Sequence, residues 1–249
     1  MSLGEIALLG GAGFLAGAVN AVAGGGSLIS FPALLAVGQP AVTANVTNAV
    51  AVVPGYLGGT IGYRRELQGQ RRRAVGLAAT SIVGAVCGAI LLLVSSEKLF
   101  KAIVPFLVLF SAALLAAQPL MSKLTRGPRR GGEHTVRLHA MNFGAAVYGG
   151  YFGAGLGIML LAVLGLSIDD ELQRLNALKG LLSLVIGLVA AAYFAIFGPV
   201  QWDAAAVMAV TSLGGGQAGV VLARRLDDRV LRWVVVAFGT AVGIALFFT

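Results

Sequence analysis

Charged residues in this chain are gathered into short clusters that are separated by uncharged runs of membrane-spanning length. Only 11% of the 249 residues are charged, against about 25% in soluble domains. Apart from Glu5, Lys179 and Asp203, the charges fall in five clusters: Arg64–Arg73, Glu97–Lys101, Lys123–Arg137, Asp169–Arg174 and Arg224–Arg232. A helix needs roughly 20 apolar residues to cross a bilayer. The charge distribution therefore predicts an integral, multi-pass membrane protein.

The remaining composition excludes several other classes. The formal charge of +8 would suggest nucleic-acid binding in a soluble protein, but here the arginines lie in loops between apolar runs. Lipid headgroups and membrane orientation explain them better, so we expect contact with membrane lipid and none with nucleic acid. The single cysteine, Cys87, excludes an intramolecular disulfide and a cysteine-based metal site. The N-terminus lacks the basic region of a cleaved signal peptide.

The apolar pattern predicts ten helical pieces, and the two halves of the chain repeat each other. The expected pieces are 5–22, 28–37, 41–63, 74–95, 99–121, 138–152, 158–167, 170–197, 204–223 and 229–248. A shift of 131 residues superimposes the halves without a gap. It places Gly13, Gly24, Gly26, Asn45, Thr80, Ser81, Gly84 and Gly88 on Gly144, Gly155, Gly157, Asn176, Thr211, Ser212, Gly215 and Gly219. We expect a first repeat at 1–121, a basic cytoplasmic linker at 122–137 and a second repeat at 138–249.

Loop charges indicate that the two repeats have opposite orientation. The loop 64–73 holds five arginines and its equivalent, 198–203, holds none. The next loop shows the reverse bias, with two lysines at 97–101 and four arginines at 224–232. Since cytoplasmic loops carry the excess of Lys and Arg, equivalent loops lie on opposite sides of the membrane. The prediction is an inverted-topology repeat, an arrangement common among secondary transporters.

This orientation predicts that segments 5–37 and 138–167 enter and leave the membrane on the same side. Each would be a re-entrant helical hairpin broken at glycines, giving an all-α fold of two inverted repeats, each with one such hairpin and three spanning helices. Both termini would lie outside. The alternative is that 5–22 crosses the membrane completely, since its length is about 27 Å.

The glycine breaks are the main candidate site. They lie at Gly24-Gly25-Gly26 and at Gly153-Ala154-Gly155-Leu156-Gly157. Non-helical backbone at membrane depth must be buried in protein or line a cavity. Each break begins a short helix, at Ser27 and at Ile158, whose free N–H groups favour an anion. Two such helix starts would form a site for a small anion; the alternative is that the glycines serve only tight packing or a kink.

Polar residues on the following helices are expected at the same depth. Asn45 and Asn48 lie one turn apart, and the shift of 131 places them on Asn176 and Lys179. Asn48 would lie roughly 12 Å and Lys179 roughly 14 Å below the membrane surface, both near the midplane. An intramembrane lysine indicates function by default. The alternatives are snorkelling of Lys179 to the interface and interhelical hydrogen bonding by the asparagines.

Three weaker candidates and one absence complete the polar inventory. Asn20 and Ser27 flank the first break and would supply donors or cap a helix end; Gln217 would face the membrane interior or pack. Asp and Glu are absent from the expected spanning runs. This disfavours a carboxylate proton relay, divalent-cation binding and catalysis, so we expect neither an enzyme nor a cofactor or metal. If transport is proton-coupled, the proton would be carried on Lys179 or on the anion.

Each half of the chain carries a glycine motif followed by a helix with polar residues near its start. The first half carries GFLAGAVNAVAGGGSLISFPALLAVG and then TANVTNAVAVVPGYLGG; the second carries YFGAGLGIMLLAVLGL and then LNALKGLLSLVIGLVAAAYFAIFGPVQW. In these stretches the sequence resembles the TauE/SafE family of membrane transporters. The second glycine motif is interrupted by Ala154 and Leu156, where the family commonly shows an unbroken glycine run. The resemblance implies a secondary transporter of the bacterial inner membrane that exports sulfite or an organosulfonate.

The predicted function is therefore export of a small sulfur-containing oxyanion by alternating access. The expected anion-binding residues are Asn20, Gly24, Gly25, Gly26, Ser27, Asn45, Asn48, Gly155, Gly157, Asn176, Lys179 and Gln217. An anion channel of the same architecture and a non-transporting membrane scaffold are the alternatives. The sequence is compatible with an oligomer without specifying one.

Overall fold

The structure is a computed structural model that describes residues 1–22, 24–124, 135–222 and 228–248. Ten α-helices make up these residues: α1 (Leu3–Val22), α2 (Ser27–Ala36), α3 (Ala41–Gly62), α4 (Arg71–Val94), α5 (Glu97–Leu124), α6 (Thr135–Tyr151), α7 (Leu156–Ser167), α8 (Leu172–Phe197), α9 (Trp202–Leu222) and α10 (Asp228–Ala245). They correspond one to one to the expected pieces, with ends that differ by a few residues. The linker expected at 122–137 lies mostly outside the described residues.

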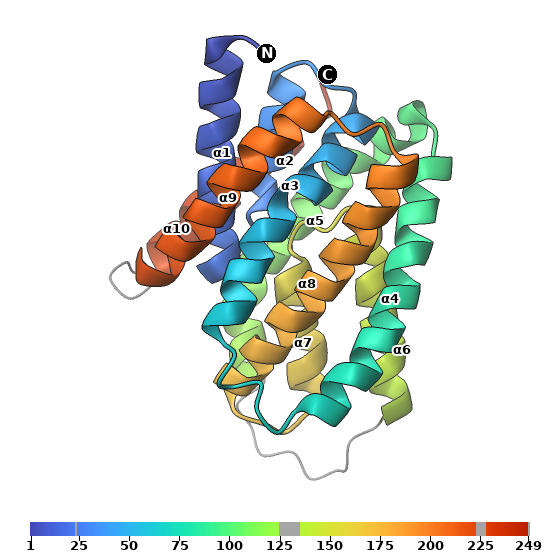
Figure 1. Ribbon diagram of the computed structural model, residues 1–249, viewed down its shortest axis with the longest axis vertical. Helices are drawn as coiled ribbons and strands as arrows, with labels where there is room; N and C mark the ends of the chain where they lie inside the picture. Colours follow the sequence, from blue (N-terminus) through green and yellow to red (C-terminus); the bar gives the residue numbers. More distant parts are fainter. Residues whose placement is uncertain (23, 125–134, 223–227, 249) are drawn as a thin grey trace.

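Helices α3 and α8 pack against each other and form the centre of the bundle (Figure 1). Helix α9 covers α1 and α3, and α4 covers α6 and α8, while α5 pairs with α10. Under the shift of 131 residues, α1, α3 and α4 correspond to α6, α8 and α9. Each packing pair therefore has its equivalent in the other half of the chain.

Glycines set the close approach in the two equivalent covering pairs. A Cβ on Gly17 of α1 would collide with the carbonyl oxygen of Ser212 on α9. A Cβ on Gly88 of α4 would collide in the same way with the carbonyl oxygen of Val147 on α6. Membrane helices use small residues in this way to bring backbones together, because lipid offers no hydrophobic drive for association.

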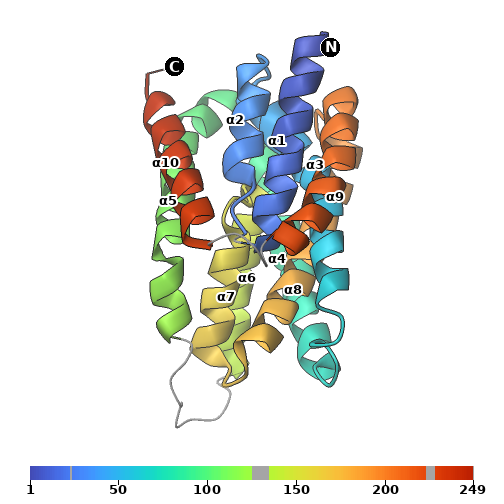
Figure 2. The same ribbon diagram turned by 90° about the vertical axis from the view of Figure 1, so that its left-hand side faces the viewer.

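The short helices lie in opposite halves of the molecule. Figure 2 shows α1 and α2 side by side in the half that holds both chain ends, and α6 and α7 in the other half. The links between α1 and α2 and between α6 and α7 both lie near mid-height. Helices α9 and α10 also lie in the half with the chain ends in both views (Figures 1 and 2).

Four of the described helical segments are long and apolar enough to cross a membrane: Leu3–Ala21, Arg71–Val94, Glu97–Leu120 and Leu172–Phe197. Three of them coincide with expected spans. The first is the segment expected to be re-entrant, with a full crossing as its alternative. The structure is thus all-helical over its described residues with several candidate spans, and the count of six crossings and two re-entrant hairpins stays a prediction.

The buried side chains form two clusters. One cluster joins α1, α2, α3 and α5 to α8, α9 and α10 and includes Phe31, Phe100 and Phe194. The second joins α4, α6, α7 and α8 and includes Leu160 and Leu178.

Candidate functional site

Both helix breaks depend on glycines with left-handed backbone. Gly24, between α1 and α2, has φ +83°, and Gly155, which precedes α7, has φ +74°. Residues with a Cβ are disfavoured there, whereas glycine adopts this region freely. Helix α2 begins at Ser27 as predicted, and α7 begins at Leu156, two residues before the expected start.

The two breaks touch each other. A Cβ built on Gly157 would lie 3.5 Å from the Cα of Gly24, and one built on Gly24 would lie 3.4 Å from the Cα of Gly157. A methyl group at Gly157 would therefore be in ordinary van der Waals contact with Gly24, so the two breaks lie close together across the two halves of the chain.

A small cavity lies beside this contact. Its volume is about 40 Å³, which is room for about three water molecules. Helices α1, α3, α7 and α8 and the segments after α1 and α3 form its walls. The lining residues are Asn20, Ala21, Gly24, Gly55, Tyr56, Thr60, Tyr63, Gly157, Asn176, Lys179, Gly180 and Ser183.

Lys179 is the one charged side chain among these lining residues. It is half-buried, and a Cβ on Gly157 would lie 3.7 Å from its Cδ and 3.8 Å from its Cε, so its stem runs along the second break. Within the described part of the chain, no carboxylate forms an ion pair with Lys179. The cavity therefore has a positive charge that the described carboxylates do not compensate.

Two neutral polar groups add to this charge. The Oδ1 of Asn20 accepts a hydrogen bond of 2.8 Å from the N–H of Gly26, so Asn20 holds the start of α2. Its Nδ2, which can only donate, is buried without a partner among the described residues, as is the hydroxyl of Ser183. Buried donors without partners are costly, and a bound acceptor would satisfy them.

Asn45 and Asn48 lie outside this cavity and bind other partners. The Nδ2 of Asn45 donates to the carbonyl oxygen of Tyr151 at 2.8 Å. The Oδ1 of Asn48 accepts from the hydroxyl of Ser30 at 2.5 Å. Both asparagines are buried and do not line the cavity; they hold α3 against the end of α6 and against α2.

The other predicted residues do not line the cavity. Ser27, Gly25, Gly26 and Gly155 are buried in the packing of the breaks. A Cβ on Gly26 would collide with the carbonyl oxygen of Ala16. Gln217 of α9 is exposed. Of the twelve predicted residues, the cavity gathers Asn20, Gly24, Gly157, Asn176 and Lys179.

Four polar lining residues were not predicted: Tyr56, Thr60, Tyr63 and Ser183. Their spacing carries a signal, because positions 56, 60 and 63 fall on one helical face, and 183 lies one turn beyond Lys179. Extending the face of Lys179 by one turn would have found Ser183, whereas Tyr56, the first of the other three, lies eight residues beyond Asn48.

Aromatic rings fill the region equivalent to the cavity in the other half. The shift of 131 residues places Asn20 and Ala21 on Tyr151 and Phe152. Phe152 stacks edge-on against Phe31 with 5.4 Å between ring centroids, and Tyr151 against Phe100 at 5.7 Å. The repeat-equivalent region is thus filled, and its aromatic side chains pack between the cavity and the end of the molecule that holds the termini.

A polar network closes the opposite end. Asp170, just before α8, pairs with Arg73 and with Arg174, each at 2.9 Å. The Nε2 of Gln70 donates to the carbonyl oxygen of Arg174 at 3.1 Å, and Arg174 donates to that of Gln68 at 3.3 Å. These bonds fasten the segment between α3 and α4 to the start of α8.

The fold and the cavity together define a polytopic helical membrane protein with a polar cavity, lined by Lys179, beside the two helix breaks. The family described as "Sulfite exporter TauE/SafE" matches residues 9–246. The chain belongs to this family and is a membrane transporter.

The relatives carry the same description. A "Probable membrane transporter protein" of Haemophilus influenzae is 28% identical over 238 residues, which cover 93% of this chain and 90% of that protein. A "Probable membrane transporter protein" of Sinorhizobium is 27% identical and covers 94% and 89%. YfcA of Escherichia coli K12, with the same description, is 26% identical and covers 94% and 86%. No solved structure matches the chain.

Proposed function

We propose that this transporter moves a small sulfur-containing oxyanion, sulfite or an organosulfonate, through the cavity beside Lys179. The observation that carries the proposal is the uncompensated Lys179 ammonium in a cavity that also holds the unpartnered donors of Asn20 and Ser183. A cation would find no carboxylate among the lining residues. An oxyanion has acceptor oxygens for all three groups.

The mechanism we propose is alternating access by two inverted repeats. The equivalent packing pairs and the placement of α1–α2 and α6–α7 in opposite halves support such a repeat. In this state the aromatic cluster of Phe31, Phe100, Tyr151 and Phe152 closes one side and the Asp170 network closes the other. Opening one closure at a time would expose the cavity to each side in turn.

The small volume of the cavity fits a closed intermediate of this cycle. About 40 Å³ admits a compact ion with few atoms and excludes a bulky one. Because sulfite is smaller than the organosulfonates, we propose sulfite as the substrate that needs the least rearrangement. The bacterial inner membrane is the location we propose, in line with the bacterial relatives.

Counterflow in proteoliposomes tests the proposal. Vesicles loaded with unlabelled sulfite should accumulate labelled sulfite transiently, and external organosulfonates should compete, whereas sodium or magnesium ions should not. Absence of anion flux in either direction would overturn the proposal. Flux that never saturates and shows no trans-stimulation would replace the transporter mechanism with a channel.

A further inference from the structure

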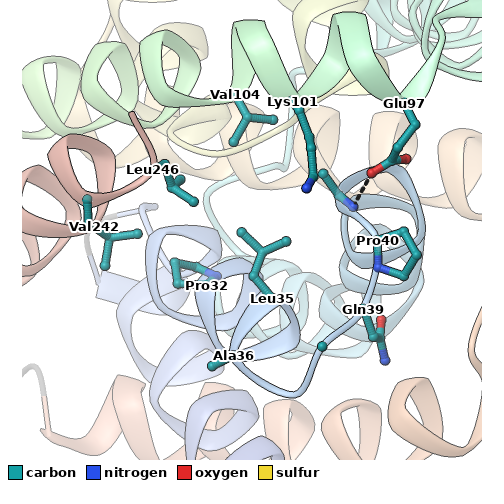
Figure 3. A pocket seen from close by; sticks show the side chains of 13 residues that line it. Pro32, Leu35, Ala36, Gln39, Pro40, Glu97, Lys101, Val104, Val242 and Leu246 are labelled. Carbon is teal, nitrogen blue, oxygen red and sulfur yellow. Dashed lines mark hydrogen bonds between the residues drawn. The ribbon is translucent and has the colours of Figure 1, made fainter. Parts of the chain in front are cut away.

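A second and larger cavity lies between α2, α5 and α10. Its volume is about 720 Å³, and it shares no lining residue with the cavity beside Lys179. Figure 3 shows its apolar walls, formed by Pro32 and Leu35 of α2, Val104 of α5, and Val242 and Leu246 at the end of α10. The volume is in the range of roughly 300–1,000 Å³ that is usual for sites of small organic ligands.

The cavity lies at the periphery of the bundle. Helices α5 and α10, which form one side of it, expose large apolar side chains on their outer faces, among them Phe106 at 62% and Ile244 at 50% exposure. In a membrane transporter such faces contact acyl chains. The cavity is therefore next to the lipid, on the side of the molecule away from the Asp170 network.

One end of this cavity is polar. Lys101 is exposed and extends into the cavity in Figure 3. No described carboxylate pairs with it, since both oxygens of Glu97, one turn away, accept the N–H groups of Ala41 and Val42 at the start of α3. This end thus offers one cation without a carboxylate partner among the described residues.

We propose that this cavity binds a phospholipid. An acyl chain would occupy the apolar part between Leu35 and Val242, and the phosphate would bind Lys101. Basic pockets between membrane helices bind lipid headgroups in this way. A free anion would leave the apolar walls uncovered, so the amphiphilic ligand is the better match.

Lipid retention measured by native mass spectrometry tests this assignment on the full chain. The purified protein is exchanged into detergent with phosphatidylethanolamine, phosphatidylglycerol or phosphatidylcholine. Lys101→Gln should reduce retention of phosphatidylethanolamine and phosphatidylglycerol about fivefold, the effect expected of one lysine near a lipid phosphate. Val242→Trp, which fills the apolar part, should abolish retention.

Matched variants separate this site from general lipid contact. Lys98→Gln and Ile244→Trp change exposed residues on the same two helices that do not line the cavity, and should retain lipid as the unmodified protein does. The proposal would be overturned if Lys101→Gln and Val242→Trp retained as much lipid as the unmodified protein. It would also be overturned if the two control variants lost as much lipid as the two cavity variants. Sulfite flux is read separately, so failure here leaves the proposed transport function unaffected.

Discussion

Replacing Lys179 with methionine should weaken anion binding and, at the same time, stabilise the empty protein. Methionine keeps a similar volume in the cavity but removes the charge. Lys179 is half-buried beside the second helix break and has no carboxylate partner among the described residues. The charge therefore costs hydration in the empty state and attracts the substrate in the loaded state.

The magnitude follows from the position of the ammonium group. At a contact distance of about 4 Å and an effective dielectric constant of about 20, the attraction to a monoanion is about 4 kcal/mol. Lost hydration offsets part of it, and truncating one partner of a desolvated charge pair costs about 2–5 kcal/mol. Because Lys179 is only half-buried, the lower end of about 2 kcal/mol applies, a loss of about 30-fold in affinity.

Two measurements check this prediction. Sulfite Kd for detergent-purified protein should rise about 30-fold in Lys179→Met, while the unfolding midpoint without anion should increase. Lys98→Met, at an exposed position outside the site, should change neither. An unchanged Kd would refute the role of Lys179 in binding. A lower unfolding midpoint in Lys179→Met would refute the view that its charge is uncompensated.

Three further predictions concern the contact of the breaks and the helix ends. Gly157→Leu should abolish sulfite flux, because a Cβ there already lies 3.5 Å from Gly24, whereas Gly144→Leu, with open space around it, should keep flux. Asp170→Asn removes two ion pairs and should lower the unfolding free energy by about 1 kcal/mol at low salt. The difference should shrink in about 0.5 M salt, because screening increases. A difference that does not depend on salt would contradict an ionic role for Asp170. Glu97→Ala leaves two N–H groups at the start of α3 without acceptors and should lower the free energy of unfolding by about 1 kcal/mol. An unchanged thermal unfolding midpoint would contradict the view that Glu97 caps α3.

The helices and their breaks could be predicted because their causes are local. Lipid excludes charge and unpaired backbone, so apolar runs must be helical wherever they cross. The left-handed backbone at Gly24 and Gly155 is available to glycine at low cost, which makes the breaks visible in the sequence. The contact between the breaks also followed from the repeat, since Gly24 and Gly157 are close.

The composition of the cavity could be predicted only in part. Asn45 and Asn176 are equivalent in sequence, yet only Asn176 lines the cavity. The difference lies in residues far away in the chain, because Tyr151 accepts the hydrogen bond of Asn45 and packs where Asn20 stands in the other half. The sequence repeat alone therefore does not predict in which half the equivalent region is filled by aromatic rings.

The sequence by itself determined that this chain is helical, membrane-embedded and interrupted at two glycine motifs, and that Lys179 is a charge outside the loops. The tertiary structure decided which groups face the cavity. Asn20 accepts a hydrogen bond at the start of α2 and also lines the cavity. Thr60 of α3 and Ser183 of α8 line the same cavity. Such choices depend on side chains that meet across more than 100 residues of chain, where packing and hydrogen-bond satisfaction act together.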